Sequence, residues 1–175
     1  FPMFVKPSGN GSSYGVTRVT SREGLPAALE LAGEQGECIL IEECVVGMEI
    51  TVPVIGNENP TALPIVEIVT GDEFYNIKTK YEPASLHHVI PARLEPGVYA
   101  RAQELAIKAH NALGCRGVSR SDFIVTEDGE PVVLETNTIP GMTARSLLPD
   151  SARTGGIDFP ELCTRFIELA LENRQ

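Results

Sequence analysis

The dipeptide Asp128-Gly129 lies between two segments with strand-like patterns, residues 119–125 and 131–137. Asp-Gly between two apolar runs is a strong short-range signal for a β-hairpin with a two-residue turn. The position of the turn sets the register of the two strands, and the register determines which of their residues face each other. The predicted pairs are Glu127 with Glu130, Asp122 with Glu135, and Arg120 with Asn137.

Four polar residues are expected on one face of this hairpin. Side chains two apart on a strand share a face, and directly opposed residues have Cβ atoms about 4.5–5.5 Å apart. Arg120, Asp122, Glu135 and Asn137 should therefore form a compact quartet, unless a β-bulge breaks the register. A solvated sheet face is the alternative interpretation. Carboxylate and amide oxygens bind Mg²⁺, and a guanidinium stabilises phosphate charge, so the quartet predicts a site for Mg²⁺-bound nucleotide phosphates.

The composition excludes several other classes of protein. The chain has 175 residues, of which 42% are hydrophobic, enough to bury the core of one domain or two small ones. A net charge of −10 argues against a nucleic-acid partner, because phosphate backbones would be repelled, but it does not exclude ATP bound with Mg²⁺. No apolar run reaches the roughly 18 residues that a membrane span needs. The four scattered cysteines lack metal-binding spacing and indicate free thiols in a reducing cytoplasm.

The rest of the chain alternates between strand and helix signals. Strands are expected at 3–6, 15–20, 38–43, 49–55, 61–70 and 73–78. Helices are expected from a cap at Ser21 to about residue 32, at 96–113, and after a cap at Asp158, whereas 139–156 is loop-like with short helical possibilities. Antiparallel hairpins mixed with packing helices are typical of the α+β class.

The segment after the first strand is rich in glycine and serine. Glycines let the backbone approach a phosphate, and Ser12 and Ser13 can donate hydrogen bonds to it. Lys6 at the end of the strand is either a phosphate contact or an edge lysine that reaches solvent. A plain hairpin loop remains the alternative, because the order of residues is not that of a P-loop. Further along, Glu42 and Glu49 could accept hydrogen bonds from an adenine amine and ribose hydroxyls, or could be solvated.

A series of motifs in the chain resembles a known family. In order they are Phe4-Val5-Lys6-Pro7, Gly11-Ser12-Ser13, Ile41-Glu42-Glu43, Gly47-x-Glu49, Thr79-Lys80-Tyr81, Ser119-Arg120-Ser121-Asp122 and Leu134-Glu135-Thr136-Asn137-Thr138-x-Pro140-Gly141-Met142-Thr143. Their order and spacing resemble the ATP-grasp superfamily and, within it, the D-alanine–D-alanine ligases, over essentially the whole chain. The family's usual apolar residue between Arg and Asp is Ser121 here, which should lie on the opposite face and affect packing only.

This resemblance implies an α+β ATP-grasp fold, with antiparallel sheets packed with helices and the nucleotide between two subdomains. Residues 1–50 would be part of the central subdomain, and 51–175 the C-terminal catalytic subdomain. The chain opens inside an apolar strand, so we interpret it as a piece of a longer protein whose N-terminal substrate domain lies upstream. The piece alone should have little or no activity, and the full-length protein should be a homodimer.

The resemblance also implies roles for individual residues. Nucleotide-binding roles fall on Lys6, Ser12, Ser13, Glu42, Glu49 and Lys80. Ligands of two Mg²⁺ or Mn²⁺ ions would be Asp122, Glu135 and Asn137. Catalytic roles fall on Arg120, Ser12, Tyr81 and Gly141, and substrate-binding roles on Lys80, Arg120, Gly141, Ser146 and Leu147.

The implied reaction joins two D-alanines at the expense of ATP, through an acyl phosphate, for peptidoglycan precursor synthesis in the cytoplasm. The partners would be D-alanine and ATP, with no nucleic acid and no membrane. D-alanine–D-lactate and D-alanine–D-serine ligases on the same scaffold are alternatives. The pair Lys80-Tyr81 favours D-alanine, although His87 and His88 lie close in sequence. A non-catalytic nucleotide-binding module is an alternative of a different class.

Overall fold

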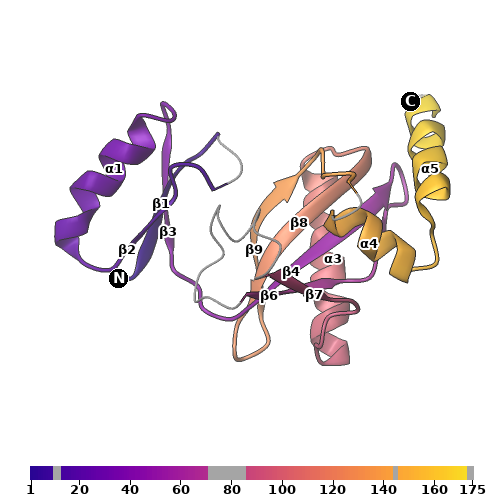
Figure 1. Cartoon of the computed structure of the whole chain (residues 1–175), viewed down its shortest axis with the longest axis horizontal. Coiled ribbons are helices and arrows are strands. Elements are labelled where there is room, and N and C mark those ends of the chain that lie inside the picture. The colour runs from indigo at the N-terminus through magenta and orange to yellow at the C-terminus, as the bar shows by residue number, and fades with distance from the viewer. Residues whose placement is uncertain (10–12, 71–85, 144–145, 173–175) are drawn as a thin grey trace. The chain divides into compact units, whose positions relative to one another are not determined.

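The computed structural model describes residues 1–9, 13–70, 86–143 and 146–172. The chain divides into two compact units, one of Phe1–Val45 with Thr70–Leu86 and one of Val46–Val69 with His87–Gln175. Figure 1 shows the elements of each unit. The division after Val45 lies a few residues before the boundary expected at residue 50.

The first unit is a small antiparallel sheet with one helix. Its strands are β1 (Met3–Pro7), β2 (Thr17–Val19) and β3 (Ile39–Glu43), in the order β2-β1-β3. The 3-10 helix η1 (Arg22–Gly24) follows Ser21 and leads into α1 (Leu25–Gly33), so the regular helix begins later than the predicted cap implies. Ala28 and Ala32 of α1 pack against Val5 and Val19, which gives this unit its own core.

The second unit contains a larger sheet in the order β7-β6-β4-β8-β9. Its strands are β4 (Met48–Gly56), β6 (Val66–Thr70), β7 (Leu86–Val89), β8 (Gly117–Val125) and β9 (Pro131–Asn137), and β5 (Thr61–Ala62) pairs with β4. The predicted strand 61–70 is therefore wrong as a single element. It is interrupted at Pro64, which has no N–H to donate to a ladder. The strand predicted at 73–78 lies outside the described residues.

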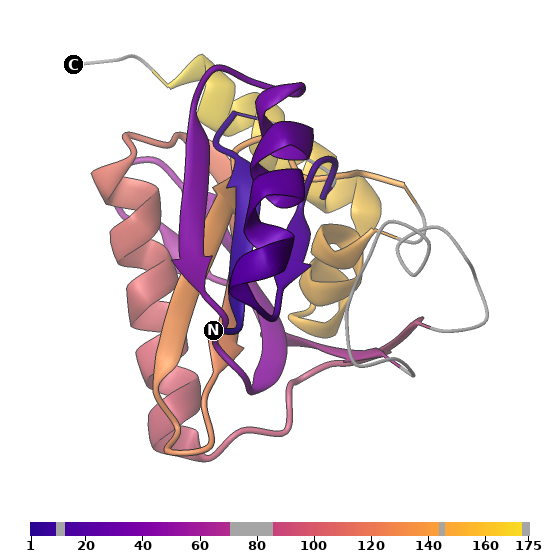
Figure 2. The same ribbon diagram turned by 90° about the vertical axis from the view of Figure 1, so that its left-hand side faces the viewer.

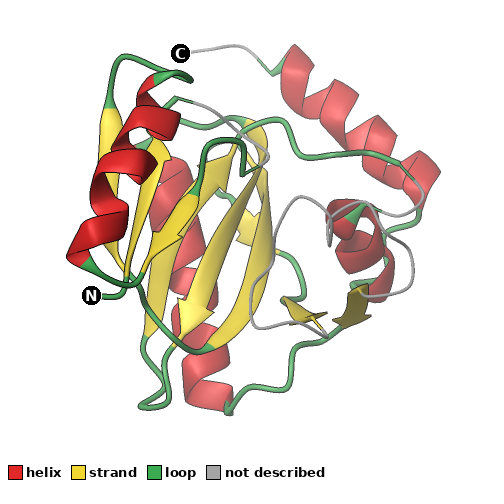
Figure 3. Ribbon diagram, turned by 60° about the vertical axis from the view of Figure 1, so that its left-hand side comes forward, coloured by secondary structure: helices red, strands yellow, loops and turns green. Residues whose placement is uncertain are grey.

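Helices cover both faces of this sheet. The helix α3 (Pro96–Ala112) packs Ala102 and Ala106 against Ile50, Val52 and Phe123, and these side chains are fully buried. The small alanines let the helix backbone approach the sheet closely. Figure 3 shows α3 lying along one face of the strands. The helix predicted at 96–113 is confirmed, and Leu113, directly after its last residue Ala112, is 63% exposed.

The other face of the sheet is partly covered by α4 (Leu147–Thr154) and α5 (Phe159–Leu171). Leu148 and Leu162 pack against Ile55 of β4 in a second buried cluster. Figure 2 shows α3 on one side of the sheet and α4 on the other. The predicted cap of α5 is confirmed, since Asp158 Oδ1 accepts a hydrogen bond from Glu161 N at 2.9 Å. Every helix in the described part of the chain is too short or too polar to span a bilayer.

A histidine is buried between α3 and the sheet. The side chain of His110 is inaccessible to solvent, and its Nδ1 lies 2.8 Å from Ser119 Oγ of β8. Burial lowers the pKa of His110, because the charged ring would lose its hydration. In an unfolded chain the histidine pKa is about 6.5. As the pH falls below that value, the unfolded state therefore binds the proton first, and its free energy falls relative to that of the folded state.

We expect this histidine to make folding sensitive to mild acid. Its contribution should lower the free energy of unfolding by at most about 1.4 kcal/mol per pH unit below about pH 6.5. Chemical denaturation at about pH 7.5 and about pH 5.5 should show a smaller loss of stability for His110→Gln than for the wild type. An equal loss in both proteins would contradict this account. The other titratable groups are shared by both proteins, so the comparison isolates His110.

Candidate functional site

The register of the β8–β9 hairpin brings the predicted quartet together. Asp122 pairs with Glu135 and Arg120 pairs with Asn137, as predicted. Buried and less buried residues alternate along β8, and Ser121 and Phe123 are fully buried on the face toward α3. The quartet therefore lies on the face away from α3.

The tip of the hairpin differs from the prediction. Thr126 N donates to Glu130 O at 3.1 Å and Gly129 N to Thr126 O at 2.9 Å, so the loop is the three-residue segment 127–129. Gly129 has φ 83°, as expected for the left-handed position of such a loop. The predicted pair of Glu127 with Glu130 is therefore wrong. The register shifts again between Asp122 and Phe123, where Leu134 is the extra residue of a bulge. The two shifts cancel, which is why the quartet pairs as predicted.

The Asp122 carboxylate is held by two side chains. Arg120 Nε donates to Oδ1 and Arg120 Nη2 to Oδ2, both at 3.0 Å. The two side chains are only 16% and 20% exposed. On the neighbouring strand β4, Thr51 Oγ1 donates to Asp122 Oδ1 at 2.5 Å. The carboxylate is thus fixed in orientation by a bidentate ion pair and a buried hydroxyl.

The remaining candidate metal ligands come from β9. Glu135 is exposed, and Asn137 Oδ1 accepts a hydrogen bond from Ile139 N at 3.0 Å. Among the described residues there is no group of three or more His, Cys, Asp or Glu side chains that could hold a metal ion. Two carboxylates and one amide nevertheless form an all-oxygen donor set of the kind that Mg²⁺ takes together with substrate phosphates. The chemistry of the residues therefore fits Mg²⁺ bound to a nucleotide better than a protein-only metal site.

In the first unit, two predicted nucleotide contacts pair with each other. Lys6 Nζ lies 2.7 Å from Glu42 Oε2, and the side chains are 19% and 30% exposed. Strands β1 and β3 place Phe4 opposite Glu42, so Lys6 reaches it diagonally across the sheet. This ion pair limits the side-chain freedom of both residues.

The predicted phosphate loop is only partly described. Ser13 has φ 58°, a left-handed conformation that is uncommon for residues other than glycine. Its carbonyl accepts a hydrogen bond from Val16 N at 3.4 Å. Ser12 lies outside the described residues, as do Lys80 and Tyr81 of the second predicted loop. Glu49 lies on β4 opposite Ile124.

Three of the predicted substrate residues, Gly141, Ser146 and Leu147, lie near the start of α4. Ser146 Oγ accepts a hydrogen bond from Thr143 N at 3.0 Å, and Ser146 N donates to Thr143 O at 2.9 Å. A Cβ atom at Gly141 would lie 2.8 Å from Ser146 Oγ, so a larger residue there would displace the serine. Ser146 directly precedes Leu147, the first residue of α4.

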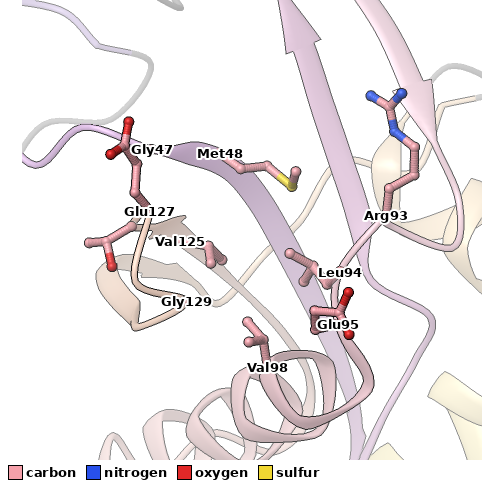
Figure 4. A pocket seen from close by; sticks show the side chains of 10 residues that line it. Gly47, Met48, Arg93, Leu94, Glu95, Val98, Val125, Glu127 and Gly129 are labelled. Atoms are coloured by element: carbon pink, nitrogen blue, oxygen red, sulfur yellow. The ribbon is translucent and has the colours of Figure 1, made fainter.

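A separate pocket opens at the end of the second unit near the hairpin loop (Figure 4). In Figure 4, Glu127 and Arg93 lie at opposite edges of an apolar floor. The lining residues are Gly47, Met48, Arg93, Leu94, Glu95, Val98, Val125, Thr126, Glu127 and Gly129. None of the predicted site residues that the structure describes lines this pocket. It continues the core between α3 and the sheet, because Val125 and Val98 belong to that cluster.

Ser121 is fully buried and its Oγ lies 2.8 Å from Thr136 Oγ1, which confirms that Ser121 affects packing on the face away from the quartet.

Thr51 was missed by the sequence analysis. The alternation of Glu49 and Thr51 along β4 places them on one face, but only the non-local pairing of β4 with β8 reveals the contact with Asp122.

The fold and the hairpin define a class of protein. Ligases of the ATP-grasp fold have this architecture of antiparallel sheets packed with helices. A D-Ala:D-Ser ligase from Enterococcus faecalis matches 98% of the chain and 50% of its own length at 34% identity, with a TM-score of 0.85. A D-alanine–D-alanine ligase from Bacillus anthracis, complexed with ATP, matches 98% of the chain and 54% of its own length at 34% identity, with a TM-score of 0.80.

The sequence comparisons narrow the class to a family. The family model described as the D-ala D-ala ligase C-terminus matches residues 1–168. A D-alanine–D-alanine ligase from Syntrophobacter fumaroxidans is 48% identical over 98% of this chain and 56% of its own length. The chain belongs to the D-alanine–D-alanine ligase family and corresponds to its C-terminal part. It spans about half the length of the curated relatives that it matches.

Proposed function

We propose that, in the full-length protein, this chain carries the nucleotide and metal site of an ATP-dependent D-alanine–D-alanine ligase. The observation that carries the proposal is the hairpin of β8 and β9. It places Arg120 and Asp122 opposite Asn137 and Glu135 in a member of this family. The product would be the D-alanyl-D-alanine unit of peptidoglycan precursors, on which the bacterial cell wall and cell shape depend.

The oxygen donors of the hairpin suit metal-bound phosphates. We propose that Asp122, Glu135 and Asn137 hold two Mg²⁺ or Mn²⁺ ions together with phosphate oxygens of ATP. Bound Mg²⁺ would neutralise charge on the phosphates. The ion pair of Arg120 with Asp122 keeps the guanidinium beside this site.

The reaction would proceed in two steps. A carboxylate oxygen of the first D-alanine forms a bond to the γ-phosphorus of ATP, the bond to the bridging oxygen breaks, and ADP leaves. The amine of the second D-alanine then attacks the acyl phosphate carbonyl, and phosphate leaves as the amine loses a proton. Arg120 and the backbone at Gly141 would stabilise the developing negative charge. Activation is needed because a free carboxylate is a poor electrophile.

Further residues would bind the nucleotide and the second substrate. Proposed contacts to ATP are Lys6, Ser12, Ser13, Glu42, Glu49 and Lys80. The linked pair Thr143–Ser146 supports binding of the substrate carboxylate at Ser146 and Leu147. Lys80 and Tyr81 would act near the same substrate. We further propose a cytoplasmic homodimer with neither membrane nor nucleic-acid partners, in line with the net charge of −10.

The second substrate can be tested directly. The full-length protein, incubated with ATP, D-alanine and either D-serine or D-lactate, should form D-alanyl-D-alanine as its main product, identified by mass spectrometry. D-alanyl-D-serine as the main product would support the second candidate, which the similarity to the Enterococcus faecalis enzyme favours. An absence of ATP turnover with every pair would overturn both and favour a nucleotide-binding module. The 175-residue chain alone should form little or no dipeptide.

A further inference from the structure

A buried threonine contacts the proposed metal ligand Asp122. Thr51 lies on the central strand β4, between Asp122 of β8 on one side and Val66 of β6 on the other. It is only 1% exposed. Water therefore cannot reach this position, and it would not replace the hydroxyl in a variant that lacks it.

The hydroxyl of Thr51 has one proton and two possible acceptors. Asp122 Oδ1 lies 2.5 Å from Oγ1, whereas the carbonyl oxygen of Ser121 lies 3.3 Å away. The shorter contact goes to a charged acceptor, so it is the stronger bond. Because threonine is β-branched, its χ1 angle has few choices and the oxygen is held in place.

The two oxygens of the Asp122 carboxylate accept different numbers of hydrogen bonds. Oδ1 accepts from Thr51 and from Arg120 Nε, and Oδ2 accepts from Arg120 Nη2. A carboxylate oxygen has about two lone-pair positions. The greater remaining capacity for a cation therefore lies at Oδ2.

We propose that Thr51 is a positioning residue for metal binding, whose hydroxyl holds the Asp122 carboxylate in the orientation that binds the metal–nucleotide. This inference rests on the proposed function of Asp122 as a metal ligand. Hydrogen-bonding partners of metal ligands commonly contribute about 10- to 100-fold to metal affinity or activity. Thr51 would not touch ATP or D-alanine itself.

The test compares metal dependence in variants of the full-length protein. Binding of a non-hydrolysable ATP analogue is measured by calorimetry at increasing Mg²⁺ concentrations. Thr51→Val keeps the volume and removes the hydroxyl, and it should raise the Mg²⁺ concentration at half-saturation about 10- to 100-fold. Thr51→Ser keeps the hydroxyl and should stay close to the wild type. Should the valine variant fail to fold, Thr51→Cys gives the same comparison, because a thiol is a weak donor.

Thr136→Val is the matched control. It is the same chemical change on β9, but the Thr136 hydroxyl bonds Ser121 on the face away from the quartet. Its Mg²⁺ dependence should match the wild type, even if its thermal unfolding midpoint falls. An unchanged Mg²⁺ dependence in a folded Thr51→Val variant, or an equal shift in Thr136→Val, would overturn the inference.

The two proposals can fail separately. If the wild type binds the analogue with Mg²⁺ and Thr51→Val shifts that dependence, the role of Thr51 stands even when no dipeptide forms. If the wild type binds no nucleotide with Mg²⁺, both the role of Thr51 and the proposed function are overturned.

Discussion

Replacing Asp122 by Asn should lower kcat of the full-length protein about 10²- to 10³-fold, the range typical of losing one preorganised electrostatic group. The amide keeps the size of the side chain but loses the negative charge that would bind the metal. It also places an NH₂ group where a carboxylate oxygen now accepts from Arg120 or Thr51. Steady-state ATP turnover with D-alanine at saturating Mg²⁺ measures the effect.

Asp128→Asn provides the control for this change. Asp128 lies in the hairpin loop, is exposed, and belongs to the same hairpin. Its replacement should leave kcat within about twofold of the wild type, because exposed charges away from the site contribute little. Near-normal turnover by a folded Asp122→Asn variant would show that Asp122 is not part of the catalytic site.

Replacing Arg120 by Lys should lower kcat about 10²-fold while the charge is conserved. The guanidinium now donates two parallel hydrogen bonds to Asp122, and an ammonium cannot reproduce that fork. The remaining cation would be poorly placed against the charge that develops on the transferring phosphoryl group. Turnover of ATP and dipeptide formation would both be measured.

The matched control for Arg120 is Arg165→Lys on α5. Arg165 also donates two hydrogen bonds to a carboxylate, that of Glu161, but both side chains are nearly half exposed. Such surface pairs contribute little, so kcat should not change. Equal activity of the Arg120→Lys variant and the wild type would show that the fork has no catalytic role.

Local signals in the sequence predicted much of the second unit. The helix from Pro96, the cap at Asp158 and the strands around Asp128 follow from periodicity and turn chemistry, which act over a few residues. The hairpin register shows the limit of such reasoning. A longer loop and a bulge at Leu134 shift the pairing in opposite senses, and Asp-Gly alone does not encode either of them.

The contacts that the sequence did not predict are non-local. Thr51 and Asp122 are far apart in the chain, and only the order of strands in the sheet makes them neighbours. The ion pair of Lys6 with Glu42 likewise depends on the pairing of β1 with β3. Residue type and spacing suggested functions for Lys6 and Glu42 separately, whereas the fold shows that they are also partners.

The most direct test of the metal site is a crystal structure of the full-length protein with Mn²⁺ and a non-hydrolysable ATP analogue. Anomalous scattering would locate the metal without assumptions about its ligands. We expect two Mn²⁺ ions, coordinated between them by carboxylate oxygens of Asp122 and Glu135 and by Asn137 Oδ1, together with phosphate oxygens of the analogue. Bound nucleotide with its metal ions away from these three side chains would contradict the proposed site.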